Sequence, residues 1–215
     1  PPRSTLFPYT TLFRSAAFTL QRTVKEGKTI TQQIQIIRDE VDRSDRIITE
    51  LMGYARLVEG HVERLDVVEE MERAVGQVFP AAAPYEVKLE RNYLAPLPSL
   101  LMQRGHLSEV LVNLMKNARE AMQGRGTLSL SARSPEAGWV ELQVADNGPG
   151  MAPEVRERVF EAYFSTKDGG SGLGLAIVKH NVEIYGGEIR VESELGRGTR
   201  FILTFPVKTV MRLRT

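Results

Sequence analysis

The sequence predicts an α+β protein in which a helical hairpin precedes a domain of helices and strands. Between Ile30 and Val58, apolar residues recur at alternating spacings of four and three, a pattern typical of a coiled-coil helix. From Asp66 to Pro206, helical and strand-like apolar periods follow one another. With 215 residues, of which 42% are hydrophobic and 26% charged, the chain has ordinary globular composition and enough length for a core.

Composition excludes several classes of function. The formal net charge of +1 offers no broad attraction to nucleic acid, so we expect no nucleic-acid partner. The absence of cysteine excludes disulfides and thiolate metal sites and fits a cytoplasmic location. No apolar run approaches the ~20 residues of a membrane helix, so we expect no membrane contact from this chain. A longer parent protein could still be anchored through a preceding segment.

Residues 1–15 are expected to be non-native. Thr5–Ser15 reads TLFPYTTLFRS, which matches the in-frame translation of a widely used sequencing adapter. A genuine Thr-rich leader is the alternative. If the segment is an artefact, the natural sequence is interrupted in or just before Ala16.

Residues 16–62 are expected to form the helical hairpin. The seam of its longer helix extends over four heptads with one polar position, Ser44, and charges such as the Asp42–Arg46 pair lie between the seam positions. Because two helices cannot bury this stripe alone, we expect a homodimer that forms a four-helix bundle through the hairpin. The alternative is a helix that packs on its own globular domain.

A linker over 60–65 leads into a second domain, expected at 66–208, with a tail at 209–215. Asp66 is the expected N-cap of a helix that ends near Phe79. Val87 and Leu89 begin a strand, which ends before the prolines at 96–98.

The helix expected from Arg104 to Met122 carries Asn113 and Asn117 on one face. Asparagine is a poor helix former, so two of them in mid-helix require a reason. An amide oxygen can bind Mg²⁺ that shares its coordination sphere with phosphates. Two solvent-facing amides are the alternative.

Two alternating runs, Gly126–Arg133 and Trp139–Ala145, predict a β-hairpin. The second run continues directly into Asp146-Asn147-Gly148-Pro149-Gly150. An aspartate held at a strand end by a glycine turn can accept a hydrogen bond from an exocyclic amine such as that of adenine, and the glycines let the backbone approach a flat ring. Taken alone, the segment is explained equally well as a turn.

An aromatic segment, Phe160–Lys167, and a glycine cluster, Gly169–Gly174, precede an apolar helix that Gly186-Gly187 closes. The aromatic rings could fasten the root of a loop, and the free N–H groups at the start of the helix offer an anion site. The sequence of this cluster fits neither the dinucleotide fingerprint nor the P-loop. Two strands, Glu188–Ser193 and Thr199–Pro206, complete the domain.

In combination, these motifs resemble the ATP-binding domain of sensor histidine kinases, most closely of the nitrogen-regulation type, within the wider family that includes Hsp90, type II topoisomerases and MutL. The corresponding segments are the N box at Asn113–Ala118, the G1 box at Asp146–Gly150, the F box at Phe160–Lys167, the G2 box at Gly170–Leu175 and the last glycine motif at Gly196–Thr199. The resemblance covers about Asp66 to Val207, with order and spacing intact. The helical arm resembles the second helix of the family's dimerisation and histidine-phosphotransfer bundle.

This resemblance implies the two-layer α/β sandwich of histidine kinase and Hsp90-type ATPases, with ATP and Mg²⁺ as ligands. Asn117 is the expected Mg²⁺ ligand, with Asn113 beside it at the phosphates. Asp146 is expected to hold the adenine amine above Gly148 and Gly150. Lys116 and Lys167 are phosphate contacts or surface lysines. The other expected nucleotide contacts come from the F box, the lid at 165–171, the G2 box and the last glycine motif: Phe160, Thr166, Gly170, Ser171, Gly172, Leu173, Gly174, Leu175 and Thr199.

One position separates a kinase from an ATPase. ATPases of the family carry a glutamate one turn before the Mg²⁺ asparagine, whereas Asn113 occupies this place and cannot accept a proton. We therefore expect a histidine kinase that transfers the γ-phosphate of ATP to a histidine, for relay to the aspartate of a response-regulator receiver domain. The alternatives are an ATPase switch of the topoisomerase, chaperone or MutL type, which turns over without an acceptor, and a non-catalytic scaffold.

None of the three histidines has the H-E-[LI]-[RK]-N-P neighbours of the family's phosphoacceptor. We expect His61, His106 and His180 to be structural or exposed and the acceptor to be missing from this chain. On this interpretation the polypeptide binds ATP and Mg²⁺ and dimerises, but does not phosphorylate itself.

Overall fold

The computed structural model describes residues 32, 34–37, 41, 61–83, 85–167 and 170–207. The chain divides into two compact units, Pro1–Leu57 with Lys167–Ser171 and Val58–Thr166 with Gly172–Thr215. In the first unit, residues 32, 34–37 and 41 are helical, with Ile34 buried and Ile36 and Ile37 exposed. The hairpin turn, the rest of the heptad seam, segment 1–15 and tail 209–215 lie outside the described residues.

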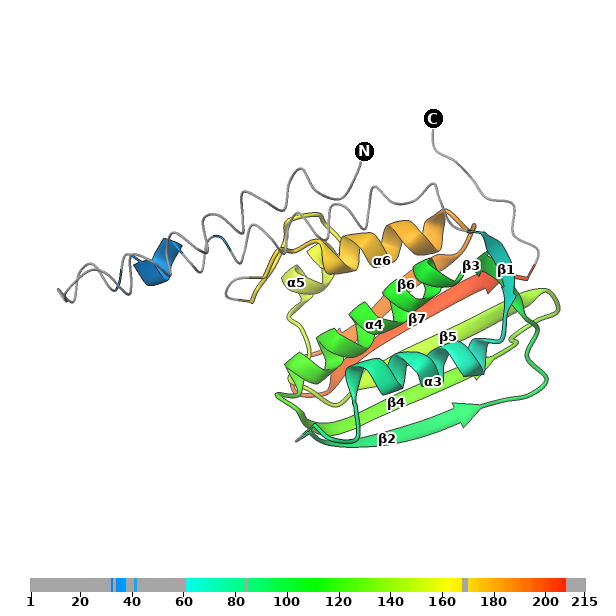
Figure 1. Cartoon of the computed structure of the whole chain (residues 1–215), viewed down its shortest axis with the longest axis horizontal. Helices are drawn as coiled ribbons and strands as arrows, with labels where there is room; N and C mark the ends of the chain where they lie inside the picture. Colours follow the sequence, from blue (N-terminus) through cyan, green and yellow to red (C-terminus); the bar gives the residue numbers. More distant parts are fainter. Residues whose placement is uncertain are drawn as a thin grey trace. The chain divides into compact units, whose positions relative to one another are not determined.

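The second unit is built on a five-stranded sheet in the order β2-β4-β5-β7-β6. β2 pairs with β4 in parallel, and the other pairs are antiparallel. Helices α3, α4 and α6 cover one face of the sheet (Figure 1), so the predicted α+β architecture is confirmed for this unit. The strands are β2 (Glu86–Tyr93), β4 (Arg125–Arg133), β5 (Trp139–Asp146), β6 (Glu188–Glu194) and β7 (Gly198–Pro206), and the helices are α3 (Val67–Val78), α4 (Arg104–Ala121) and α6 (Gly174–Glu183).

The core lies between the helices and the inward face of the sheet. Alternate residues of the central strands face inward, and the strand register places Leu130, Val144 and Phe201 in one row. These side chains are buried together with the apolar stripe of α4, which includes Leu107, Leu111 and Leu114. Burial of this stripe explains why the helical period at 104–122 was readable from the sequence.

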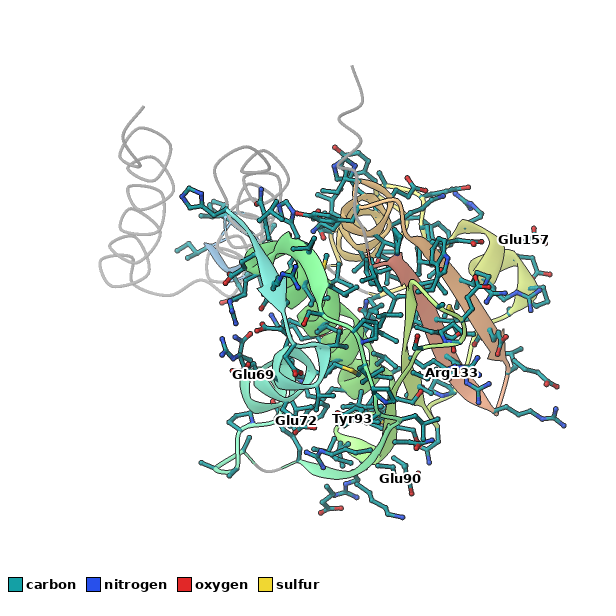
Figure 2. All side chains as sticks on the ribbon, turned by 90° about the vertical axis from the view of Figure 1, so that its right-hand side faces the viewer. Glu69, Glu72, Glu90, Tyr93, Arg133 and Glu157 are labelled. Carbon is teal, nitrogen blue, oxygen red and sulfur yellow. The ribbon has the colours of Figure 1, made fainter. Side chains whose placement is uncertain are left out.

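Polar contacts fix α3 to the edge of the sheet. The carboxylate of Asp66 accepts hydrogen bonds from the backbone N–H groups of Val68 and Glu69, which confirms the predicted N-cap. Further along α3, Glu72 accepts from the hydroxyl of Tyr93 at 2.7 Å and from Nε of Arg91 at 2.8 Å (Figure 2). The hydrogen bond from Arg91 lowers the pKa of Glu72, whereas burial raises the pKa of Tyr93.

The expectation of a linker over 60–65 was wrong for most of its length. Val62–Leu65 forms strand β1, which pairs antiparallel with β3 (Leu100–Gln103), a strand that the sequence analysis also missed. Leu65 and Leu100 are fully buried. Arg104 adds ion pairs to Glu63 of β1 and to the buried Glu70 of α3. Both strands escaped notice because each has only four residues and its partner is distant in the sequence.

A short helix, α5 (Pro153–Arg158), follows the G1 box and was not predicted. Pro153 stands at its start, a position that favours proline, but none of its six residues is buried. A helix without an apolar stripe leaves no periodic signal in the sequence. Among the described residues, no helix is both long enough and apolar enough to cross a membrane.

The face of the sheet opposite the helices carries a buried charge. The carboxylate of Glu141 on β5 accepts hydrogen bonds from Nε of Arg133 and Nε2 of Gln143, each at 2.7 Å. The side chain of Glu141 is only 7% exposed, and the hydrogen bond from Arg133 lowers its pKa from the ordinary 4.5. Because its folded pKa is depressed, Glu141 contributes its full stabilisation above pH 4.5, and this is lost as the pH falls through the lowered pKa.

We predict that Glu141→Gln lowers the free energy of unfolding at pH 7 by about 1–2 kcal/mol, since the contact between the buried carboxylate and the half-exposed guanidinium of Arg133 loses its charge. The difference from wild type should shrink as the pH falls below 4.5 and through the lowered pKa, where the wild-type carboxylate becomes protonated. Urea denaturation followed by circular dichroism at several pH values measures both effects. Glu192→Gln is the matched control, because its ion pair with Arg200 lies on the same face with both side chains more than half exposed. A constant difference between wild type and Glu141→Gln across this pH range would contradict the assignment.

Candidate functional site

Asp146 ends β5 and is held in a fixed orientation. Its Oδ1 accepts a hydrogen bond from the backbone N–H of Gly148 at 2.9 Å, and the backbone of Thr199 on β7 contributes a second hydrogen bond. Partial burial raises the pKa of Asp146, and the two backbone hydrogen bonds oppose this shift. The result is a half-buried, partly desolvated acceptor, which suits a ligand that presents an N–H group.

Gly148 leaves room beside this carboxylate. A Cβ placed on Gly148 would lie 2.8 Å from Oδ1 of Asp146 and 3.4 Å from atoms of Ala121 on α4. A side chain here would displace the carboxylate or fill the space between the turn and α4. The geometry is consistent with the expected close approach of a flat ring.

Gly150 and Gly198 are required by backbone packing. Gly150 has φ +69°, and a Cβ on it would lie 2.0 Å from the carbonyl oxygen of Glu194. Gly198 has φ +88°, and its Cβ would lie 2.0 Å from the carbonyl oxygen of Asp146. These two glycines therefore let the turn after β5 and the turn between β6 and β7 lie against each other. This packing role of Gly150 is not apparent from the sequence, where the glycine suggests only a close approach of the ligand.

Two residues at this end of the sheet were also missed as site-forming groups. Oδ1 of Asn147 accepts from the backbone N–H of Thr127 at 2.8 Å and ties the turn to β4. Ser193 of β6 hydrogen bonds to Met151, Gly198 and Thr199. Asn147 lies inside a motif that was recognised, but the sequence carries no signal for the partners of Ser193.

At the other end of the site, α4 faces the start of α6. A Cβ on Gly174, the first residue of α6, would lie 3.6 Å from Oδ1 of Asn113. Asn113 and Asn117 are both half-buried on α4, whereas Lys116 is exposed. The helix start and the Asn113 amide thus form one polar region, in which the N–H groups of the first helical turn favour an anion.

A polar seam continues from this region along the contact between α4 and α6. Glu109 accepts a hydrogen bond from Nδ2 of the buried Asn181 at 2.9 Å, so its role is structural. The hydroxyl of Tyr185 lies 2.7 Å from Nδ1 of His106 and accepts from the backbone N–H of Gln103 at 3.1 Å. Burial and the nearby His180 lower the pKa of His106. His106 is therefore a structural histidine, and His61 is exposed.

A backbone hydrogen bond holds the two ends of the expected lid together. Tyr163 has φ +66°, and its N–H donates to the carbonyl oxygen of Gly172 at 3.0 Å. A Cβ on Gly172 would lie 2.5 Å from the carbonyl carbon of Tyr163. Phe160 packs edge-on against Phe201 of β7, with 6.2 Å between ring centroids. The aromatic segment therefore fastens the loop at its root, partly through the backbone of Tyr163, whose side chain is 69% exposed.

Of the other site residues predicted from the sequence, some lie in the core and some at the surface. Leu173 is buried at the start of α6, and Leu175 packs against the core. Thr166 and Lys167 are exposed, and Gly170 and Ser171 are half-buried. Residues 168 and 169 lie outside the described part of the chain.

A cavity of about 840 Å³ opens beside Asp146 and Thr199. Ser193, Met151 and Val191 also line it, together with the exposed side chains of Arg156, Arg197 and Arg200. Of the predicted site residues, only Asp146 and Thr199 line this cavity. The asparagines of α4 and the glycines that precede α6 do not line it.

Comparisons with known proteins identify relatives of this chain. Residues 102–209 match the family of histidine kinase-, DNA gyrase B- and HSP90-like ATPases. The chain is 35% identical to the sensor histidine kinase ZraS of Escherichia coli O157:H7 over 176 residues, which are 82% of this chain and 38% of ZraS. The chain thus spans well under half the length of this relative.

Two solved structures share the fold. Full-length ShkA in complex with AMPPNP has a TM-score of 0.72 and 28% identity, covering 96% of this chain and 44% of ShkA. Histidine kinase ThkA in complex with the response regulator TrrA has a TM-score of 0.68 and 21% identity, covering 92% of this chain and 57% of ThkA.

We predict that Gly198→Ala and Gly196→Ala differ sharply, although both glycines have positive φ in the same turn. Gly196→Ala should cost about 1 kcal/mol, because a Cβ there meets no atom within 4 Å and only the left-handed conformation is strained. Gly198→Ala should cost about 3 kcal/mol or more, because its Cβ collides with backbone. Chemical denaturation of both variants measures the difference. Equal losses would show that the turns do not need this close approach.

Proposed function

Because the chain belongs to the family of histidine kinase-, DNA gyrase B- and HSP90-like ATPases, as the catalytic domain of a sensor histidine kinase, we propose that ATP binds with its base at Asp146 and its phosphates between α4 and the N-terminus of α6. The observation that carries this proposal is the oriented carboxylate of Asp146. It is partly desolvated and held by two backbone donors, so it can accept from the exocyclic amine of adenine.

At the phosphate end we propose Asn117 as the protein ligand of Mg²⁺, with Asn113 at the phosphates. Both are neutral oxygen donors on one helix face, and Asn113 lies against the first turn of α6. Bound Mg²⁺ would neutralise charge on the β- and γ-phosphates. The N–H groups at the start of α6 and the glycines before it would then orient the phosphate chain.

We propose transfer of the γ-phosphate to a histidine rather than to water. Asn113 cannot take a proton from water, and the carboxylate of Glu109, one turn further back, is engaged by the buried Asn181. The site can therefore align ATP and neutralise charge, but none of its described residues offers a general base beside the phosphates. His61, His106 and His180 lack the neighbours of a phosphoacceptor, so the histidine that receives the phosphate is one outside this chain.

The partners follow from the same assignment. The heptad seam at 30–58 supports a homodimer formed through the helical hairpin. The resemblance to sensor kinases supports relay of the phosphate to a response-regulator receiver domain. At the level of the fold, the ThkA–TrrA complex supports such a relay.

Calorimetric titration of ATP and ADP, with and without Mg²⁺, tests the proposal. We predict that Asp146→Asn weakens the binding of both nucleotides about tenfold or more, since a hydrogen bond to a charged group is lost. Asn117→Ala should remove the gain in ATP affinity that Mg²⁺ provides and leave Mg²⁺-free ADP binding nearly unchanged. Ser129→Ala, on the opposite face of the sheet, is the control. Nucleotide binding that is unaffected by Asp146→Asn would overturn the proposal.

A further inference from the structure

Three residues form one row across the end of the sheet beside the cavity. The strand register places Asp146 of β5 opposite Thr199 of β7, and Thr199 opposite Ser193 of β6. All three line the cavity of about 840 Å³. The hydroxyl groups of Ser193 and Thr199 lie 3.0 Å apart.

The hydroxyl of Ser193 has three polar neighbours. It accepts from the backbone N–H of Met151 at 2.8 Å, donates to the carbonyl oxygen of Gly198 at 2.9 Å and lies within hydrogen-bond distance of Oγ1 of Thr199. Met151 belongs to the turn after β5, whereas Gly198 and Thr199 begin β7. One side chain thus connects both sides of the base end of the site.

The hydrogen-bonding capacity of a hydroxyl determines the direction of the third contact. A serine hydroxyl has one proton and two lone pairs. The carbonyl oxygen of Gly198 can only accept, so all three contacts form at once only when Ser193 donates its proton to Gly198. The second lone pair of Ser193 then accepts from Thr199, and the proton of Thr199 points toward Ser193.

This orientation leaves Thr199 with only lone pairs for a ligand. We infer that Ser193 is a specificity-determining positioning residue, which fixes the hydroxyl of Thr199 as an acceptor so that the site presents two acceptors, Asp146 and Thr199, to the base. Such a pair favours a purine with an exocyclic amine at position 6, directly or through a water. It disfavours a 6-oxo purine, whose oxygen would face two further acceptors. The inference rests on the proposed function, because it assumes that the base lies at Asp146.

ATP and inosine triphosphate, which carries an oxygen in place of the amine, test this assignment. Their affinities are measured by calorimetry or by displacement of a fluorescent ADP analogue from the full chain. In Ser193→Ala the hydroxyl of Thr199 is free to donate to the 6-oxo group. We expect the ratio of ATP to inosine triphosphate affinity to fall about fivefold, as for the exchange of one neutral hydrogen bond.

Thr199→Val provides a second, independent variant, because it removes the hydroxyl with little change in shape. It should also lower the ratio, and Ser193→Ala added to Thr199→Val should produce no further change. Ser129→Ala should leave the ratio at its wild-type value. Thermal denaturation of each variant separates loss of fold from loss of discrimination.

The outcomes are distinct. A fall in the ratio in Ser193→Ala that disappears in the Thr199→Val background supports the inference. An equal loss of affinity for both nucleotides in Ser193→Ala shows a merely structural role and overturns it, as does an unchanged ratio in Thr199→Val. A folded wild-type chain that binds neither nucleotide contradicts the proposed function itself. Asp146-dependent ATP binding with an unchanged ratio in Ser193→Ala contradicts only the inference.

Discussion

The backbone of the turn between β6 and β7 lies so close to the turn after β5 that no side chain fits between them. Gly150 and Gly198 make this approach possible, since a Cβ on either would lie 2.0 Å from a carbonyl oxygen. The approach brings Thr199 beside Asp146 and Ser193 within reach of Met151. The orientation of the Asp146 carboxylate, the direction of the Thr199 hydroxyl and the shape of the base end of the site all depend on it.

The phosphate end depends on a different contact, the polar seam between α4 and α6. The hydrogen bonds of Glu109 to Asn181 and of His106 to Tyr185 fix how the two helices align. This alignment places the start of α6 against Asn113. The two ends of the site are thus held by separate sets of interactions, so a substitution at one end should leave the other intact. That separation is what allows base recognition and Mg²⁺ dependence to be tested independently.

The sequence predicted the parts of the fold that bury periodic apolar faces. The stripe of α4, the alternating strands β4 and β5 and the cap at Asp66 were all readable, because their signals are local. Strands β1 and β3 and helix α5 were missed, since two of them are four residues long and the third buries nothing. In the candidate site, the motifs predicted ligand contacts such as Asp146 and Asn117, which stay predictions, and did not reveal that Gly150 serves backbone packing. The role of Ser193 depends on partners brought together by folding, which no single sequence reveals.

A crystal structure of this chain with a non-hydrolysable ATP analogue and Mg²⁺ is the most direct test of the account. The account predicts the exocyclic amine within hydrogen-bond distance of the Asp146 carboxylate and of the Thr199 hydroxyl or a water bound to it. It also predicts Mg²⁺ at Asn117 and the phosphates at the N-terminus of α6. A nucleotide held instead by Arg156, Arg197 and Arg200, with the Asp146 carboxylate facing solvent, would contradict it.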